Sequence, residues 1–293
     1  MLLFATTDAL RASPAKQRFN DTTWHSTKEE ALHYLDSVRQ LHASSYWPNV
    51  EPDLFLQNLK AFVFAPMKFY EGRSTNFCAY SALSYIPFYY KPLAFCRFMI
   101  TLYKTGEAKM GKVFFHPGPE IRAEAGLLKY KGPLDINPMG QMWFLSLADQ
   151  FKGYVNFFNR KFDKGDENTL WAATNLHKLK RMLRELFPFP VHSRGFELWR
   201  PCIKNVYEFL HEKLRTGVVF LHLKFTSLYS SDDVKGHPDI PTHFVHLIDI
   251  QKTNNGMIDM YYSKNGVKTL QRITPRLLKK IVFGIAWCVI REK

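Results

Sequence analysis

Hydrophobic residues recur at helical spacing in the first part of the chain. Between residues 27 and 64 they return mostly every third position, in two stretches that Pro48 and Pro52 separate. This period is typical of amphipathic helices that bury one face. The positions that carry it are Leu32, Leu35, Val38 and Leu41, then Leu54, Leu56, Leu59 and Phe62. The sequence therefore predicts two helices in this region.

A polar loop then leads into a short segment of small and aromatic residues, 79–86. We expect this segment to be a helix that Pro87 ends, because proline lacks the N–H group that a helix interior needs. Cys78 would then lie in the first turn, where Thr75 or Asn76 is placed to cap the helix.

The middle of the chain, residues 88–200, has few strand signals and several helical ones, for example over 176–187. No internal repeat is found. We therefore predict a largely helical section between the segment that contains Cys78 and the C-terminal part.

After about residue 200 the pattern changes to short apolar runs bounded by turn signals. A helix over 206–214 is expected to end at Gly217, and Asn255-Gly256 is typical of a hairpin. Strands are predicted at 218–225, 242–250, 257–262 and 283–290, with a basic helix from Thr274-Pro275 to about Val282. These elements predict an α+β fold, a single domain over residues 1–293 that ends in a small antiparallel sheet.

Composition limits the class of protein. The chain has 293 residues, of which 46% are hydrophobic and 23% are charged, as in globular proteins. Its four cysteines are scattered and form no C-x-x-C pair, which argues against a disulfide framework or a zinc ribbon. The N-terminus lacks the basic region of a signal peptide, and no window reaches the roughly 18 apolar residues of a membrane span. We expect a cytoplasmic protein without a membrane span.

Cys78 is the first candidate for chemistry. At the start of a helix, free N–H groups and the helix dipole favour the thiolate, which is the nucleophilic form of cysteine. A cysteine of this kind is otherwise a small buried hydrophobic residue.

His243 and Asp259 are the second and third candidates. His243 opens a predicted strand, and a histidine held on a rigid strand is well placed as a general base. Asp259 lies sixteen residues later, on the next predicted strand, where a carboxylate can orient the imidazole. Taken alone, a histidine in this position more often has a structural role.

The order of these residues resembles that of papain-like cysteine peptidases, in particular the double-glycine leader peptidases of bacteriocin export. Asn76-Phe-Cys-Ala-Tyr-Ser-Ala-Leu83 is similar to the family's cysteine segment, and Thr242-His-Phe-Val-His-Leu247 to its histidine segment. Asp259-Met-Tyr-Tyr-Ser263 is similar to the segment around the aspartate. The resemblance covers about a third of the chain and implies a papain-like fold with Cys78, His243 and Asp259 as a catalytic triad. About 165 residues separate Cys78 from His243, more than in compact members of the family, so the resemblance also implies that residues 88–200 are a helical insertion.

The third member of the triad has a rival. If Asn255-Gly256 forms a two-residue turn, the register places Asp259 opposite Lys252, and the residue opposite His243 falls between 265 and 268. Papain itself uses an asparagine in this role, so Asn265 is the alternative to Asp259. The family's glutamine before the cysteine is Gly72 here, which leaves Asn76 or the Cys78 N–H group to stabilise the oxyanion.

A metal site is a competing interpretation of the histidines. Possible ligands fall within ten residues, namely His237, Asp239, His243 and His246. Residues three apart on a strand point to opposite faces, so His243 and His246 are poorly placed to share an ion. We therefore expect no metal and no cofactor.

The charge of +14 is the remaining feature. Half of the excess lies from Gln251 onward, including Arg276, Lys279 and Lys280 on one face of the predicted helix. No zinc finger, RNP or P-loop motif accompanies it, so nucleic acid is an unfavoured partner. We interpret the charge as a field that favours an acidic peptide or amide substrate.

The function that we expect is that of a cysteine peptidase or amidase. The alternatives are an inactive papain-like binding module, a thiol acyltransferase, or a basic protein that binds nucleic acid or an anionic surface. Substrate identity and oligomeric state cannot be read from the sequence.

Overall fold

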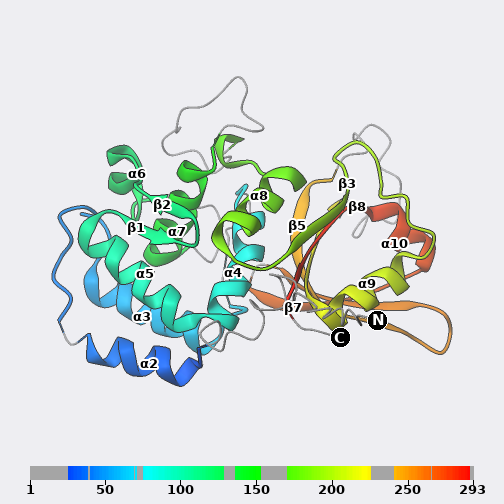
Figure 1. Cartoon of the computed structure of the whole chain (residues 1–293), viewed down its shortest axis with the longest axis horizontal. Coiled ribbons are helices and arrows are strands. Elements are labelled where there is room, and N and C mark those ends of the chain that lie inside the picture. The colour runs from blue at the N-terminus through cyan, green and yellow to red at the C-terminus, as the bar shows by residue number, and fades with distance from the viewer. Residues whose placement is uncertain are drawn as a thin grey trace, which may run out of the picture.

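The computed structural model describes residues 26–38, 40–68, 70, 75–128, 136–152, 170–225, 241–264 and 266–290. They form an α+β structure, with helices in one half and an antiparallel sheet in the other (Figure 1). The predicted α+β class with a C-terminal antiparallel sheet is therefore confirmed.

The helical half begins with α2 (Lys28–Ser37), α3 (Pro52–Phe64) and α4 (Cys78–Tyr90). It continues with α5 (Pro92–Thr105), the hairpin of β1 (Ala108–Met110) and β2 (Val113–Phe115), α6 (Pro119–Glu124) and α7 (Pro138–Gln150). A 3-10 turn, Leu170–Ala172, then precedes α8 (Leu176–Leu186).

Helix α4 is longer than predicted, because Pro87 lies inside it. Proline removes only its own N–H group from the helix, and its carbonyl still accepts a hydrogen bond from Lys91 N at 3.0 Å. The helix ends at Tyr90, one residue before Lys91 and the proline that starts α5.

The sheet half contains β3 (Val191–Gly195), α9 (Val206–Thr216), β4 (Gly217–Leu223), β5 (His243–Lys252) and β6 (Ile258–Lys264). It ends with β7 (Val267–Ile273), α10 (Pro275–Ile281) and β8 (Val282–Val289). The strand order is β3-β8-β4-β5-β6-β7, and every described pair is antiparallel. The two outer strands, β3 and β7, were not predicted, since edge strands bury little and carry a weak hydrophobic pattern.

The inner strands bury side chains on both faces. Along β4, Val218 and Phe220 belong to a core shared with the helical half, whereas Val219 and Leu221 belong to a second core. The second core lies under α9 and α10, to which Leu210 and other buried residues contribute. The sheet is thus the middle of three layers, with α4 and α8 on one side (Figure 1).

Helices α5, α7 and α8 of the middle section share the first core with α2–α4. That residues 88–200 are an insertion within a single domain stays a prediction. None of the described helices combines the length and the apolar character that a membrane crossing requires.

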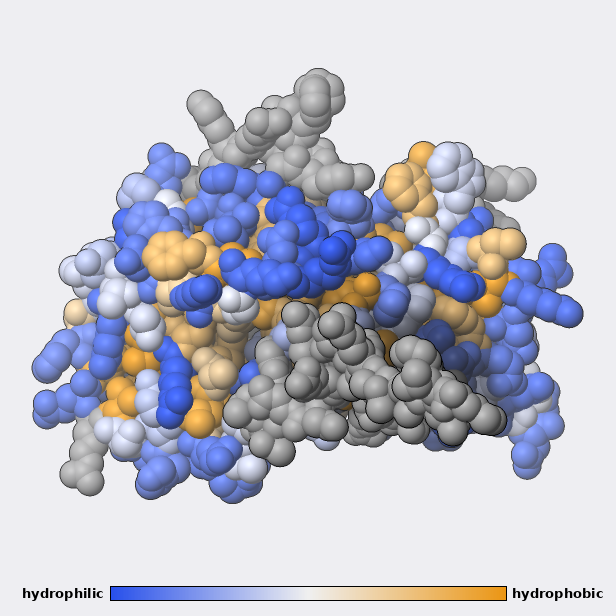
Figure 2. Space-filling model, viewed as in Figure 1, coloured by the Kyte–Doolittle hydropathy of each residue, from blue (hydrophilic) through white to orange (hydrophobic). Residues whose placement is uncertain are grey.

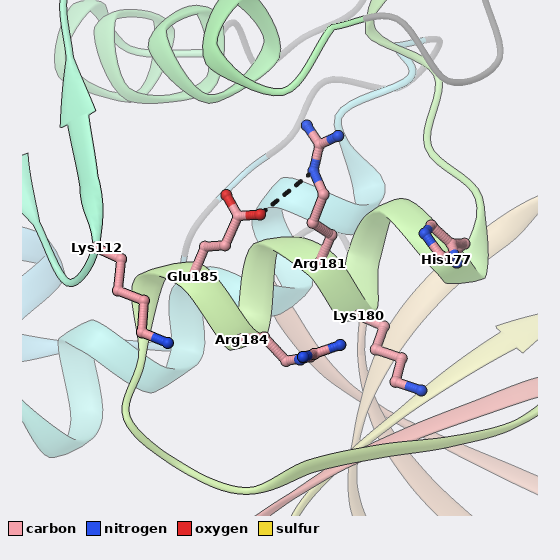
Figure 3. A pocket seen from close by; sticks show the side chains of 6 residues that line it. All are labelled: Lys112, His177, Lys180, Arg181, Arg184 and Glu185. Atoms are coloured by element: carbon pink, nitrogen blue, oxygen red, sulfur yellow. Dashed lines mark ion pairs between the residues drawn. The ribbon is translucent and has the colours of Figure 1, made fainter.

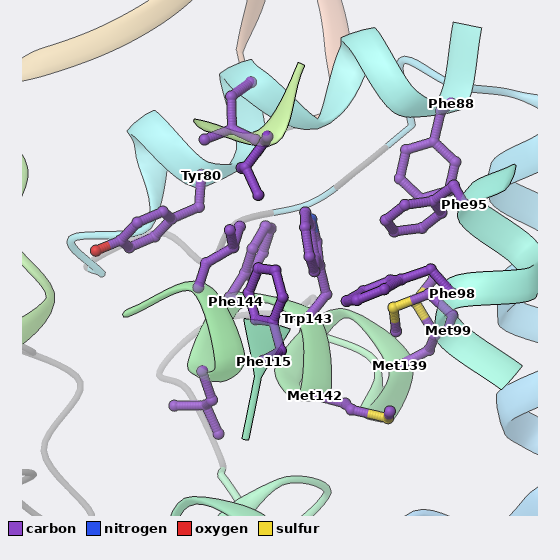
Figure 4. Close-up of a cluster of buried hydrophobic side chains, with 14 of the residues drawn as sticks. Tyr80, Phe88, Phe95, Phe98, Met99, Phe115, Met139, Met142, Trp143 and Phe144 are labelled. Atoms are coloured by element: carbon purple, nitrogen blue, oxygen red, sulfur yellow. The ribbon is translucent and has the colours of Figure 1, made fainter. Parts of the chain in front are cut away.

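Aromatic side chains in the helical core are dense around Trp143 (Figure 4). The ring centroids of Phe95, Phe98 and Phe115 lie 5.1, 5.7 and 6.0 Å from the Trp143 ring. Trp143 Nε1 donates a hydrogen bond of 2.7 Å to Ser84 Oγ, so the only polar atom of the indole is satisfied in the core.

We predict that Ser84→Ala destabilises the protein by about 1–3 kcal/mol, because it leaves the buried Trp143 N–H group without its acceptor. The measurement is urea unfolding. Ser146→Ala is the matched control, since Ser146 is equally buried and donates to the carbonyl four residues earlier, as Ser84 does. Equal losses in the two variants would contradict the role of the Ser84–Trp143 bond.

Candidate functional site

Cys78 is the first residue of α4, as the sequence predicts. The N-cap position is Phe77, whose side chain accepts no hydrogen bond, rather than Thr75 or Asn76. Thr75 Oγ1 instead accepts from the N–H group of Phe77 at 3.3 Å. The Cys78 side chain packs at the edge of the helical core and is partly exposed. A thiol in this position feels the positive end of the α4 dipole.

The other cysteines lie in different surroundings. Cys96 and Cys288 are buried, and burial raises the pKa of the Cys96 thiol to about 12 and that of Cys288 further. Cys202 is exposed and precedes α9 by four residues. Of the four, only Cys78 is both partly accessible and at the start of a helix.

His243 begins β5, opposite Leu223 of β4. Its ring lies 4.8 Å from the Phe225 ring, which packs against the second core. Burial, with a smaller contribution from Lys264, lowers the pKa of His243 to about 4. The imidazole is therefore neutral at pH 7, and a resting thiolate–imidazolium pair is not favoured.

Cys78 and His243 lie on different sides of the sheet. Cys78 contacts the helical core, whereas His243 contacts Phe225 on the side of α9 and α10. Because β5 starts at His243, the two side chains can approach each other only around this end of the strand.

The same end of β5 lies close to the chain that leads to α4. Extending the pairing of His246 with Ser263 by three residues places His243 opposite Gly266. A Cβ on Gly266 would be 3.1 Å from the carbonyl carbon of Lys68, in the connection between α3 and α4. The start of β5 and the segment before Cys78 therefore lie on the same side of the molecule.

Asp259 is not beside His243, which corrects its predicted role. The hairpin turn spans Thr253–Met257 rather than two residues, so Asp259 pairs with Gln251 on β5. Gln251 is eight residues from His243, about 26 Å along a strand. The rival residue, Asn265, lies outside the described residues.

The Asp259 carboxylate instead forms a two-bond ion pair with Arg272 of β7. Arg272 Nε and Nη2 donate to the two carboxylate oxygens at 2.7 and 2.8 Å. These hydrogen bonds lower the pKa of Asp259 below its ordinary value. Asp259 therefore joins two strands of the sheet and has its charge already compensated.

Two further histidines face α4. The His246 ring stacks on Tyr85 with centroids 3.9 Å apart, and the His222 ring stacks on Phe244 at 3.8 Å. Burial lowers the pKa of each to about 3, so both are neutral. These stacked, buried rings have the surroundings of structural histidines.

The geometry does not favour a shared metal ion. His243 and His246 lie on opposite faces of β5, as expected from strand alternation. His237 and Asp239 lie outside the described residues, and the described part of the chain holds no group of three or more His, Cys, Asp or Glu side chains suited to a metal.

Lys178 is a buried titratable residue that is not among the candidates predicted from the sequence. It is 2% exposed, and its ammonium group lies 3.2 Å from the carbonyl of Ala173 and 5.6 Å from the Tyr80 ring. Burial, then Arg181, lowers the pKa of Lys178 to about 7. In the sequence, Lys178 lies beside the apolar positions Leu179 and Met182 of α8, and this neighbourhood could have indicated that the lysine is buried.

No protein-family model matches the chain, and no curated protein matches it significantly. The resemblance to papain-like peptidases therefore depends on the short segments around Cys78, His243 and Asp259.

We predict that Asp259→Asn lowers the melting temperature at pH 7, because the ion pair with Arg272 is lost. A carboxylate whose pKa is lowered by folding stabilises above its unfolded pKa of about 3.9 and loses this effect as the pH falls. The difference from wild type should therefore shrink below about pH 4. Melting curves from pH 7 to pH 2 test this.

Asp36→Asn is the control for this experiment, since the pair of Asp36 with Lys60 is exposed and joins two helices. It should change the melting temperature little. If Asp259→Asn had no more effect than Asp36→Asn at pH 7, the structural role of Asp259 would be wrong.

Proposed function

We propose that the protein is a papain-like thiol hydrolase, a cysteine peptidase or amidase, with Cys78 as its nucleophile. The observation that carries the proposal is the position of Cys78, partly exposed at the first residue of α4. The N–H groups of the first turn and the helix dipole favour the thiolate there. The two buried cysteines lack this advantage, because burial disfavours their thiolates.

His243 is the proposed general base. The contact of Gly266 with Lys68 supports its placement at the end of the sheet near α4. Because burial keeps the imidazole neutral, one ring nitrogen of His243 carries no proton at pH 7, as a general base requires. The proton would move during the attack rather than before it.

The reaction follows from these two groups. The Cys78 sulfur attacks the carbonyl carbon of an amide, and the thiol proton passes to His243. As the C–N bond breaks, His243 returns this proton to the leaving amine, which leaves a thioester on Cys78. Water then attacks the thioester carbonyl carbon, and His243 takes a proton from the water. The C–S bond breaks, His243 returns the proton to the Cys78 sulfur, and the carboxylic acid leaves. An acyltransferase would differ only in using another acceptor in place of water.

For the third member of the proposed triad, Asn265 is preferred to Asp259. Asp259 is excluded by its position, and Asn265 keeps the role that the resemblance implies. Lys264 is the charge that acts on His243, and it disfavours the imidazolium. An acidic group on the substrate near Lys264 would offset this charge and make proton transfer to His243 easier, which supports acidic substrates.

We predict that Cys78 reacts with iodoacetamide about tenfold faster than Cys202 at pH 7, because the helix start favours the thiolate. The rates of the two cysteines are measured in the same native sample by peptide mass mapping. The comparison is internal, since Cys202 is the exposed cysteine. If Cys78 reacted no faster than Cys202 at any pH, the proposed nucleophile would be wrong.

We predict that the alkylation rate of Cys78 in the His243→Ala variant stays within about twofold of the wild-type rate, since a neutral histidine does not stabilise the thiolate. The same variant should hydrolyse p-nitrophenyl acetate about 100-fold more slowly than wild type, because general base catalysis is lost. His33→Ala, at an exposed position on α2, is the matched control. Unchanged hydrolysis in His243→Ala would remove His243 from the site, and unchanged hydrolysis in Cys78→Ser would favour an inactive binding module.

A further inference from the structure

We propose that a basic pocket beside α8 binds a small anion that carries two or more linked phosphate groups. The pocket has a volume of about 220 Å³. It is lined by six side chains, namely Lys112, His177, Lys180, Arg181, Arg184 and Glu185. In Figure 2 a band of strongly hydrophilic side chains crosses the middle of the molecule at the level of α8.

The charge of the pocket is the first argument. Four of its side chains are permanent cations at neutral pH, and Glu185 is the one carboxylate among its lining residues. His177, Lys180, Arg181 and Arg184 follow the three- and four-residue spacing that gathers side chains on one side of a helix. Cations placed so closely repel one another, and a multiply charged anion relieves this repulsion.

The opposite face of α8 fixes this arrangement. Leu179, Met182, Leu183 and Leu186 are buried in the helical core, so α8 cannot rotate without exposing them. The basic side chains are therefore held outward by the packing of the apolar ones.

Lys112 reaches the pocket from a distant part of the sequence. It lies in the turn between β1 and β2, and its N–H group donates to the carbonyl of Glu185 at 2.8 Å. The preceding Gly111 has φ +58°, and a Cβ there would be 2.4 Å from the carbonyl oxygen of Leu186. Only glycine fits this close contact, so the turn is fastened to the end of α8 with Lys112 beside Arg184.

The nitrogen-bearing ends of the side chains have an order that suits linked phosphates. Figure 3 shows Lys112, Arg184 and Lys180 in a row along one edge of the outward face of α8, with Arg181 and Glu185 along the other edge of the same face. Successive phosphate groups of one chain can each meet a cation of such a row. A single phosphate would engage only part of it.

Arg181 has unused hydrogen-bonding capacity. Its Nε lies 3.8 Å from Glu185 Oε1, too far for a hydrogen bond, and among the described residues this buried Nε has no hydrogen-bond partner. The guanidinium group is held 5.3 Å from the Phe151 ring centroid. The guanidinium group is thus held in place by Phe151 and by an ion pair with Glu185, which leaves its Nε–H group without an acceptor among the described residues. A positioned guanidinium group of this kind is suited to the oxygens of a phosphate group.

Inorganic polyphosphates and nucleoside polyphosphates share this chemistry, so the test uses both. We expect inorganic triphosphate to bind with one-to-one stoichiometry in isothermal titration calorimetry, at least about tenfold more tightly than orthophosphate, because it engages more cations. Tighter binding of ATP than of triphosphate would identify a nucleoside as part of the ligand, and equal binding would identify the phosphate chain alone as the ligand.

The variant Lys180→Gln/Arg184→Gln should bind triphosphate about 100-fold more weakly, since each lost charge-assisted hydrogen bond costs about tenfold. Arg276→Gln/Lys279→Gln on α10 removes the same charge from an exposed helix outside the pocket. This control should bind within about twofold of wild type, because distant exposed charges are screened.

Three results would overturn the proposal. One is no binding of triphosphate at low salt, and another is equal weakening by the two double variants, which would mean a non-specific effect of charge. The third is displacement of bound triphosphate by a DNA duplex at a total phosphate concentration lower than the one at which triphosphate itself binds. That result would identify a nucleic-acid surface. Cys78→Ser should bind triphosphate as wild type does, so this test is independent of the proposed thiol chemistry.

Discussion

Burial of the central strands on both faces is the constraint on which the rest of the structure depends. Strands β4, β5 and β8 send alternate side chains into two different cores, so each strand must be covered on both sides. Helices α4 and α8 cover one face, and α9 with α10 covers the other. The apolar area buried in this way favours folding, and it also decides which side chains remain for chemistry.

The two proposed sites are consequences of how α4 and α8 meet this requirement. Helix α4 lies on the sheet through contacts such as that of Tyr85 with His246, which leaves its first residue, Cys78, at the edge of the core. Helix α8 buries its leucines and presents its basic side to the pocket. The histidines of the sheet interior are neutral because burial disfavours their charged form. His243, at the start of β5, and His222, opposite Phe244 on β4, lie at the same end of the sheet.

The elements with strong hydrophobic periodicity could be predicted from the sequence. The start of α4, the course of α8, and strands β4, β5 and β6 follow from local patterns of apolar residues. The edge strands could not be predicted, because exposed positions such as those of β7 carry polar residues that also suit loops. Helix α4 passes through Pro87 because packing on both of its sides outweighs one lost hydrogen bond.

The candidate site was harder to predict, since it depends on contacts between distant residues. The sequence places Cys78 correctly at a helix start, but the residue opposite Asp259 depends on a longer hairpin turn. The residue opposite His243 depends also on a bulge between Leu247 and Asp249. A shift of register gives every side chain of a strand a different neighbour on the adjacent strand, and no local sequence pattern shows such a shift. The basic pocket also needs Lys112, which only the contact of Gly111 with α8 brings to the other cations.

The central claim is that Cys78 is a nucleophile toward acyl groups. Its most direct test is intact-protein mass spectrometry after brief exposure to p-nitrophenyl acetate at neutral pH, followed by peptide mapping. We expect one acetyl group per protein, held as a thioester on Cys78 and released by hydroxylamine. A protein that takes up no acetyl group, or takes it up on Cys202 or on surface lysines with Cys78 unmodified, would contradict it.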